Sequence, residues 1–138
     1  MYAARLMAQG CERLPFVPLG AAGRRVWTAG GPVAARLASH LAAVASGARA
    51  GREEIRRLEA WAAEAHFATS GIRGGNAGRV IAVLAARPLV SAEDVAIGAG
   101  ISRMTTERML NRMTEMGLIR EITGASRFRR WRAELPAS

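Results

Sequence analysis

The stretch from Val95 to Ile119 constrains the fold more than any other part of the chain. Gly100 stands between two segments of helical periodicity, where a linking turn needs a positive φ that glycine adopts without steric cost. Ser102 can cap a second helix through its hydroxyl, and Gly117 can end that helix. The apolar stripe of this second helix is formed by Thr106, Met109, Leu110, Met113 and Met116. The stretch therefore predicts two helices joined by a tight turn.

The opposite face of the second predicted helix is basic and hydrogen-bonding, which suits a DNA groove better than water alone. We expect Arg103, Thr105 and Arg108 to lie over base edges. Met104 beside them can add only an apolar contact, for instance to a thymine methyl group. The candidate DNA-binding residues of this helix are Ser102, Arg103, Met104, Thr105, Arg108 and Arg112.

After Gly117 the periodicity changes and predicts a small β-hairpin. Residues 118–123 form its first strand, 124–126 its turn and 127–132 its second strand. Its three arginines, which we expect to touch phosphate or enter the minor groove, are Arg127, Arg129 and Arg130. Phe128 and Trp131 are three residues apart, so a regular strand would send them to opposite faces. Either a bulge reconciles them, or Phe128 lies at the turn and only Trp131 enters the core.

The order A-x-x-x-G-I-S-x-x-T, then R-M-L-x-R-M, then G-L-I resembles bacterial winged helix-turn-helix domains. It is similar to regulators of the multiple-antibiotic-resistance type and to the winged-helix tail of some Fic proteins. The run from Ala86 to Trp131 also resembles the C-terminal end of a family of uncharacterised bacterial plasmid and chromosomal proteins, which finish in a T-G-x-x-R-F-R-x-W segment. The likeness covers roughly the last 60 residues, a typical size for such a module. It implies a mainly α fold with a small β-wing.

Residues before the turn complete a predicted winged helix-turn-helix domain at 75–133. Asn76 can cap its first helix, which Pro88 forbids to continue, and Leu89 with Val90 forms a short strand. Ser91 and Asp94 make an approximate capping box for the next helix. Because aspartate is shorter than the usual glutamate, only the serine half of the box is secure from the sequence.

The first half of the chain predicts an irregular leader at 1–31 and a helical hairpin at 32–70. The hairpin's helices span 32–46 and 53–69, and the glycine-containing segment from Gly47 to Gly51 breaks the pattern between them. Their apolar stripes are narrow and alanine-rich, so the hairpin needs the C-terminal body, a partner protomer, or both, to cover it. We therefore expect a homodimer.

Composition limits the partners and the compartment. The 138 residues carry a net charge of +9, which favours a polyanion, either nucleic acid or an acidic membrane face. All the basic side chains are arginine, for which GC-rich coding is the simplest explanation. Alanine-rich stripes with few bulky aromatic anchors, Trp61 among them, make a poor membrane-surface helix, so we expect no membrane partner. A single cysteine, Cys11, and no apolar run long enough to cross a bilayer predict a protein of the reduced cytoplasm.

No catalytic constellation is placed by spacing, so we expect neither an enzyme nor a cofactor, metal or small-molecule ligand. The segment from His66 to Arg79 is similar to the Fic catalytic motif, but the motif's proline is missing and an alanine interrupts its G-N-G-R. His66 and His40 are most simply structural, and the glycines around Asn76 lack the strand and the Lys-Ser/Thr of a phosphate-binding loop.

The sequence thus predicts a DNA-binding transcriptional regulator of bacterial type. Two alternatives stay open at this point. The winged helix can serve as a non-enzymatic module that docks another protein, since a fold alone does not confer a function. The chain can also be the C-terminal tail of a larger protein, for example a Fic-like one.

Overall fold

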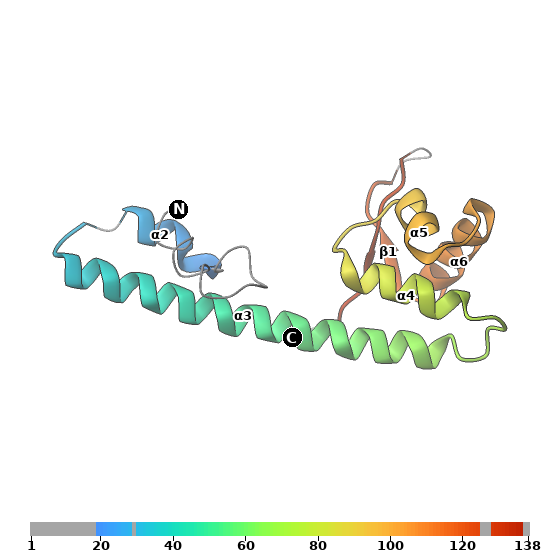
Figure 1. Cartoon of the computed structure of the whole chain (residues 1–138), viewed down its shortest axis with the longest axis horizontal. Helices are drawn as coiled ribbons and strands as arrows, with labels where there is room; N and C mark the ends of the chain where they lie inside the picture. Colours follow the sequence, from blue (N-terminus) through green and yellow to red (C-terminus); the bar gives the residue numbers. More distant parts are fainter. Residues whose placement is uncertain (1–18, 29, 125–127, 137–138) are drawn as a thin grey trace. The chain divides into compact units, whose positions relative to one another are not determined.

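A computed structural model describes residues 19–28, 30–124 and 128–136 of the chain. Its elements are mainly helical, with one small antiparallel sheet of two strands, which confirms the predicted mainly α class with a small β part (Figure 1). The chain divides into two compact units, Met1–Ile55 and Arg56–Ser138. The boundary falls inside a helix, and each unit is described by itself.

Most of the described part of the first unit is helical. A 3-10 helix, η1 (Gly20–Ala22), leads into α2 (Gly23–Thr28), and the long helix α3 (Val33–Ala68) begins after Pro32. The prediction of an irregular leader at 1–31 is therefore wrong for residues 20–28, and residues 1–18 lie outside the described residues. Alanine and arginine between the glycines favour helix more than the glycine count suggested.

The predicted helical hairpin at 32–70 is also wrong, because α3 runs without interruption through the segment expected to break it (Figure 1). Gly47 and Gly51 each cost about 1 kcal/mol relative to alanine, and no proline lies between Val33 and Ala68. Strong helix formers on both sides outweigh that cost. Gly47 has a packing role instead: it is buried, and a Cβ built on Gly20 would lie 3.1 Å from its Cα. The two glycines let η1 approach α3 closely.

The second unit gathers its core from α3 and from every later element. Its helices are α4 (Asn76–Ala86), α5 (Ala92–Ala99) and α6 (Arg103–Glu115), and its strands are β1 (Ile119–Glu121) and β2 (Trp131–Ala133). From α3, Trp61 and Ala65 are fully enclosed in this core. The indole Nε1 of Trp61 donates a hydrogen bond of 2.7 Å to the carbonyl oxygen of Leu118. The C-terminal part of α3 thus packs as a core helix of this unit, ahead of the predicted start at 75.

The contact between α4 and α5 depends on a small residue. A Cβ built on Gly98 would lie 2.8 Å from Val83 Cγ2, so the two helices meet where α5 has no side chain. At the start of α4 the predicted cap is wrong: the N-cap position is Gly75, without a side-chain bond, and Asn76 is the first helical residue. At the other end α4 stops at Ala86, in agreement with Pro88.

The turn between α5 and α6 has the conformation that the sequence predicted. Gly100 is left-handed at φ 61° and ψ 43°, and Ile101 donates its backbone N–H to the Ala96 carbonyl at 3.1 Å. The Ser102 hydroxyl accepts the Thr105 amide at 3.2 Å and caps α6. At the other end of α6, Gly117 has φ 72°, and the Leu118 amide bonds back to the Met113 carbonyl at 3.0 Å.

The sheet is shorter than predicted. Its register pairs Ile119 with Ala133 and Glu121 with Trp131, so the second strand begins at Trp131 and not at 127. Val90 makes an isolated bridge to Trp131 through two backbone bonds, whereas the neighbouring Leu89 takes no part. Trp131 is buried and Phe128 is exposed, which confirms the second of the two sequence alternatives: Phe128 lies in the loop and only Trp131 enters the core.

We predict that Gly100→Val lowers the free energy of unfolding by about 1–3 kcal/mol, because valine resists a positive φ. No atom lies within 4 Å of a Cβ at this position, so the loss is one of backbone strain and not of a clash. Gly100→Asn is the matched control, since asparagine enters the left-handed region at lower cost. Equal losses for the two variants in denaturant unfolding would contradict the assignment.

Candidate nucleic-acid interface

Helix α6 turns a mixed polar face to solvent. Thr106, Met109, Leu110 and Met113 are buried on its inner side, which leaves the outer side free of packing. One open hollow on the outer side is lined by Met104, Glu107, Arg108, Asn111, Arg112 and Glu115. The predicted residues Arg103, Met104, Arg108 and Arg112 are all exposed, and Thr105 is half-buried. Sequence reasoning missed Glu107 and Glu115 on the same face, although both fall on the outer side by spacing alone.

The arginines of this face differ in their partners. Arg103 Nε donates to Glu107 Oε1 at 3.0 Å, one helical turn away, in a pair that is largely exposed. Arg108 and Arg112 have no acidic partner among the residues that the structure describes. The Ser102 hydroxyl is occupied by its cap and lies 2.9 Å from Thr105 Oγ1. Arg108 and Arg112 are therefore the cations of α6 most available to an external anion.

A further arginine stands on one flank of α6. A hollow of about 410 Å³ lies between α6 and the loop that joins α3 to α4, and Arg73 of this loop lines it. Thr105, Arg108 and Arg112 line the same hollow from the helix. Arg73 was read from the sequence only as part of a glycine-rich hinge. Only the tertiary fold brings it beside the helix, because it precedes Thr105 by more than thirty residues.

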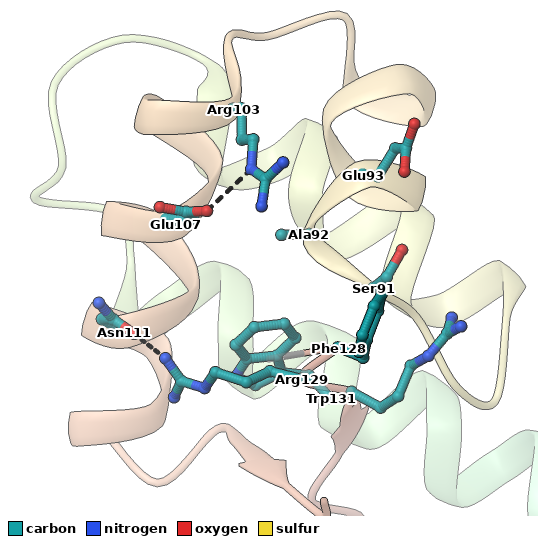
Figure 2. A pocket seen from close by; sticks show the side chains of 10 residues that line it. Ser91, Ala92, Glu93, Arg103, Glu107, Asn111, Phe128, Arg129 and Trp131 are labelled. Carbon is teal, nitrogen blue, oxygen red and sulfur yellow. Dashed lines mark hydrogen bonds and ion pairs between the residues drawn. The ribbon is translucent and has the colours of Figure 1, made fainter. Parts of the chain in front are cut away.

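On the other flank α6 meets the β1–β2 loop across a hollow of about 510 Å³ (Figure 2). Arg103, Glu107 and Asn111 line it from successive turns of α6, and Ser91, Ala92 and Glu93 line it from the start of α5. The loop contributes Phe128, Arg129 and Arg130, and Trp131 lines the hollow from the start of β2. Arg129 reaches across toward the helix, with Nη1 3.5 Å from Asn111 Oδ1 (Figure 2). Helix and loop thus present side chains to one common surface.

Acidic residues hold both described arginines of the loop. Arg129 Nε donates to Glu121 Oε2 at 3.2 Å, and its guanidinium lies 4.8 Å from the centre of the Trp131 ring. Arg130 Nη1 donates to Asp94 Oδ2 at 3.2 Å. Arg129 and Arg130 lie in the loop before β2 and not in the predicted strand 127–132, and each is oriented by a carboxylate that the sequence did not reveal. Arg127 lies outside the described residues.

Asp94 is a junction between α5 and the loop. Its carboxylate accepts the Ser91 hydroxyl at 2.6 Å and the Ser91 amide at 2.8 Å, and Ser91 Oγ accepts the Asp94 amide at 3.1 Å. Both halves of the predicted capping box are thus present, because the shorter aspartate carboxylate still reaches the Ser91 amide directly. The two bonds from Ser91, followed by the charges of Arg130 and Arg87, lower the pKa of Asp94 below its usual 3.8.

Glu121 organises the other side of the loop. Its carboxylate accepts the hydroxyl of Thr123, the amides of Thr123 and Gly124 and the guanidinium of Arg129. The hydroxyl bond from Thr123, and then the bond from Arg129, lower the pKa of Glu121 below its usual range. Since Glu121 is the last residue of β1, these bonds fix how the loop leaves the sheet.

The described part of the chain offers little to other kinds of site. It contains no group of three His, Cys, Asp or Glu side chains placed to hold a metal ion. None of its helices combines the length and the apolar character needed to cross a membrane. Comparisons with protein-family models, with curated proteins and with solved structures found no match. What the site binds is therefore inferred from its own residues.

We predict that Asp94→Asn destabilises the fold at neutral pH and that the deficit shrinks in acid. The folded pKa of Asp94 lies below 3.8, so its ionised form contributes stability above that pH and loses it as pH falls toward the folded pKa. Unfolding by denaturant, compared for both proteins between pH 7 and pH 2.5, measures the difference. A deficit that stays constant below pH 3.8 would contradict this role for the carboxylate.

Proposed function

We propose that this chain binds double-stranded DNA in a sequence-specific manner and acts as a transcriptional regulator in the bacterial cytoplasm. The binding unit is a winged helix-turn-helix in which α5 and α6 form the helix-turn-helix and the β1–β2 loop forms the wing. The observation that carries the proposal is the common surface on which the outer side of α6 and the arginines of the loop meet. A helix in the major groove and a basic loop beside it can then engage one duplex together.

The proposed roles follow from what each arginine already contacts. Arg108 and Arg112 have no acidic partner among the described residues and stand on exposed turns of α6, as base-reading arginines require. Arg129 is bonded to Glu121, and Arg130 is bonded to Asp94, so both guanidinium groups are already oriented in the free protein. Such oriented cations suit phosphate oxygens, which set register and carry no sequence information.

The acidic residues on α6 favour the alternative in which this surface binds another protein. Glu107 and Glu115 would repel phosphate, and exposed Met104 would suit a protein partner. Glu107 is already paired with Arg103, however. A glutamate over the major groove can also accept a hydrogen bond from the amino group of cytosine. Duplex DNA is therefore the partner that the larger part of the surface favours, and a protein partner is the outcome to expect if DNA fails.

We further propose that the chain forms a homodimer through the first part of α3. Val33, Val44 and Ile55 follow one another at intervals of eleven residues, which keeps them on one face of a straight helix. Leu37 and Leu41 lie on the same face. All but Val44 are strongly exposed, with Val33 at 70% and Leu37 at 56%. An apolar face of this length is unusual on a monomer. Two copies would offer two reading helices to a site with two-fold symmetry.

We predict that DNA binding is salt-dependent and that helix and loop contribute differently. Arg130→Ala should weaken binding to all duplexes about equally and reduce the log–log salt slope by about 0.9, the value of one phosphate contact. Arg108→Ala should instead relax a base preference by about 1–3 kcal/mol. The measurement is selection from random duplexes, followed by titration of each variant at several salt concentrations. Arg132→Ala is the control, since it removes the same charge from β2, outside the lining of the interface.

Two results would decide against these roles. A wild-type protein without affinity for any duplex at low salt would leave the protein-docking alternative in place. Uniform weakening by both Arg108→Ala and Arg130→Ala would mean that α6 reads no bases and that DNA is bound without sequence preference.

We predict a dimer in sedimentation at micromolar concentration, and a monomer when Leu37 and Leu41 are both changed to Glu. Two carboxylates on the apolar face would have to be buried at the interface, which is costly. The control changes Ala35 and Ala42 to Glu on another exposed part of the same helix. A monomeric wild type, or equal behaviour of the two double variants, would refute pairing through this face.

A further inference from the structure

Phe128 combines two features that do not help the chain to fold. Its side chain is 88% exposed, and its backbone is left-handed at φ 58°, the one positive φ at a non-glycine residue in the part of the chain described. A bulky aromatic residue is strained in this region. Gly124, four residues earlier in the same loop, takes φ 59° at no such cost. Glycine would therefore be the relaxed choice at position 128, and an exposed ring gains nothing by burial.

The backbone that follows Phe128 is held by hydrogen bonds to both neighbouring segments, residues 122–123 and Val90. The Arg130 amide donates to Thr123 Oγ1 at 3.3 Å, and the Arg130 carbonyl accepts the Ile122 amide at 3.0 Å. Trp131 exchanges backbone bonds of 2.9 and 3.0 Å with Val90. Arg129 is fixed by Glu121 and by the face of the Trp131 ring. Phe128 is thus an apolar side chain next to a hydrogen-bonded backbone segment, and two oriented arginines follow it directly. This arrangement is suited to a well-defined contact with a ligand.

We infer that Phe128 is an apolar wedge that enters the minor groove of the bound duplex and partly unstacks one base step. This inference rests on the proposed function. A helix that occupies the major groove leaves the loop beside it over the adjacent backbone and minor groove. Arg129 and Arg130 there would hold phosphates, while the ring of Phe128 replaces the stacking lost between two base pairs. Unstacked steps kink DNA by 20–90°, typically at flexible pyrimidine–purine steps.

Removal of the Phe128 ring should change the salt dependence of DNA binding differently from removal of its charged neighbours. A neutral ring displaces no counterions, so its removal should lower affinity without a change in the salt slope. Removal of Arg130 should lower both. The backbone at position 128 is strained only because a residue with a Cβ adopts a positive φ. Phe128→Gly should therefore leave the melting temperature unchanged or raise it. A residue that supports the fold would have the opposite effect.

The experiment compares the full chain with its Phe128→Gly, Phe128→Leu and Arg130→Ala variants on a duplex selected by the wild type. Binding is titrated at several salt concentrations, and the end-to-end distance of the duplex is followed by fluorescence energy transfer. We expect Phe128→Gly to bind at least tenfold more weakly, with the wild-type salt slope and without the kink. Phe128→Leu, which keeps an apolar wedge, should retain part of both, and Arg130→Ala should retain the kink while its salt slope falls.

The possible failures can be told apart. If the wild type binds no duplex, the proposed function fails and the wedge fails with it. If the wild type binds but Phe128→Gly binds and bends DNA equally well, the wedge is refuted while DNA binding stands. A lower melting temperature of Phe128→Gly would assign the ring a structural role. Tighter binding of single strands than of duplexes, dependent on Phe128, would replace the wedge by stacking on unpaired bases.

Discussion

The second unit depends on the burial of one indole. Trp61 is 1% exposed in the middle of its core, and its Nε1 is satisfied by the Leu118 carbonyl at 2.7 Å. Loss of a side chain of this size from a core typically costs about 3–5 kcal/mol. The bond also ties α3 to the residue at which α6 has ended and β1 is about to begin. Because Leu118 in turn bonds to Met113 of α6 and to Glu134 after β2, the indole fixes the point from which both helix and sheet take their positions.

The candidate interface is positioned by the packing around Trp61 and Leu118. Leu110 and Met113 face the core beside Trp61, so the opposite side of α6 must face solvent. The register of β1 against β2 places Glu121 opposite Trp131, and the bonds of Glu121 then shape the loop that carries the arginines. Ion pairs as exposed as these stabilise a fold very little. Their effect is one of orientation: Glu121 and Asp94 direct Arg129 and Arg130 toward the same side of the unit as α6.

Local chemistry made the central turn predictable from sequence. Gly100, Ser102 and Gly117 each act within a few residues of themselves, and all three have the predicted conformation or bond. Errors arose where distant contacts decide. Gly47 looked like a helix breaker, but its lack of a side chain makes room for Gly20. Trp61 looked like an isolated aromatic because its partner, Leu118, lies 57 residues away.

The candidate site divides in the same way. Arg108 and Arg112 could be placed on an exposed face by helical spacing, since spacing determines which side of α6 is buried. No spacing rule joins Arg130 to Asp94, 36 residues earlier, or brings Arg73 beside Thr105. The left-handed backbone of Phe128 was equally hidden, because aromatic residues rarely adopt it and the sequence pattern favoured a strand.

The proposed binding of duplex DNA engages one surface, built from the outer side of α6 and the β1–β2 loop. Amide chemical shifts of the full chain, followed by NMR during titration with a duplex selected from a random pool, test it most directly. We expect the largest shifts at residues 102–112 and at Thr123, Gly124 and residues 128–130. Shifts confined to α3 or α4, or a spectrum that the duplex leaves unchanged, would contradict it.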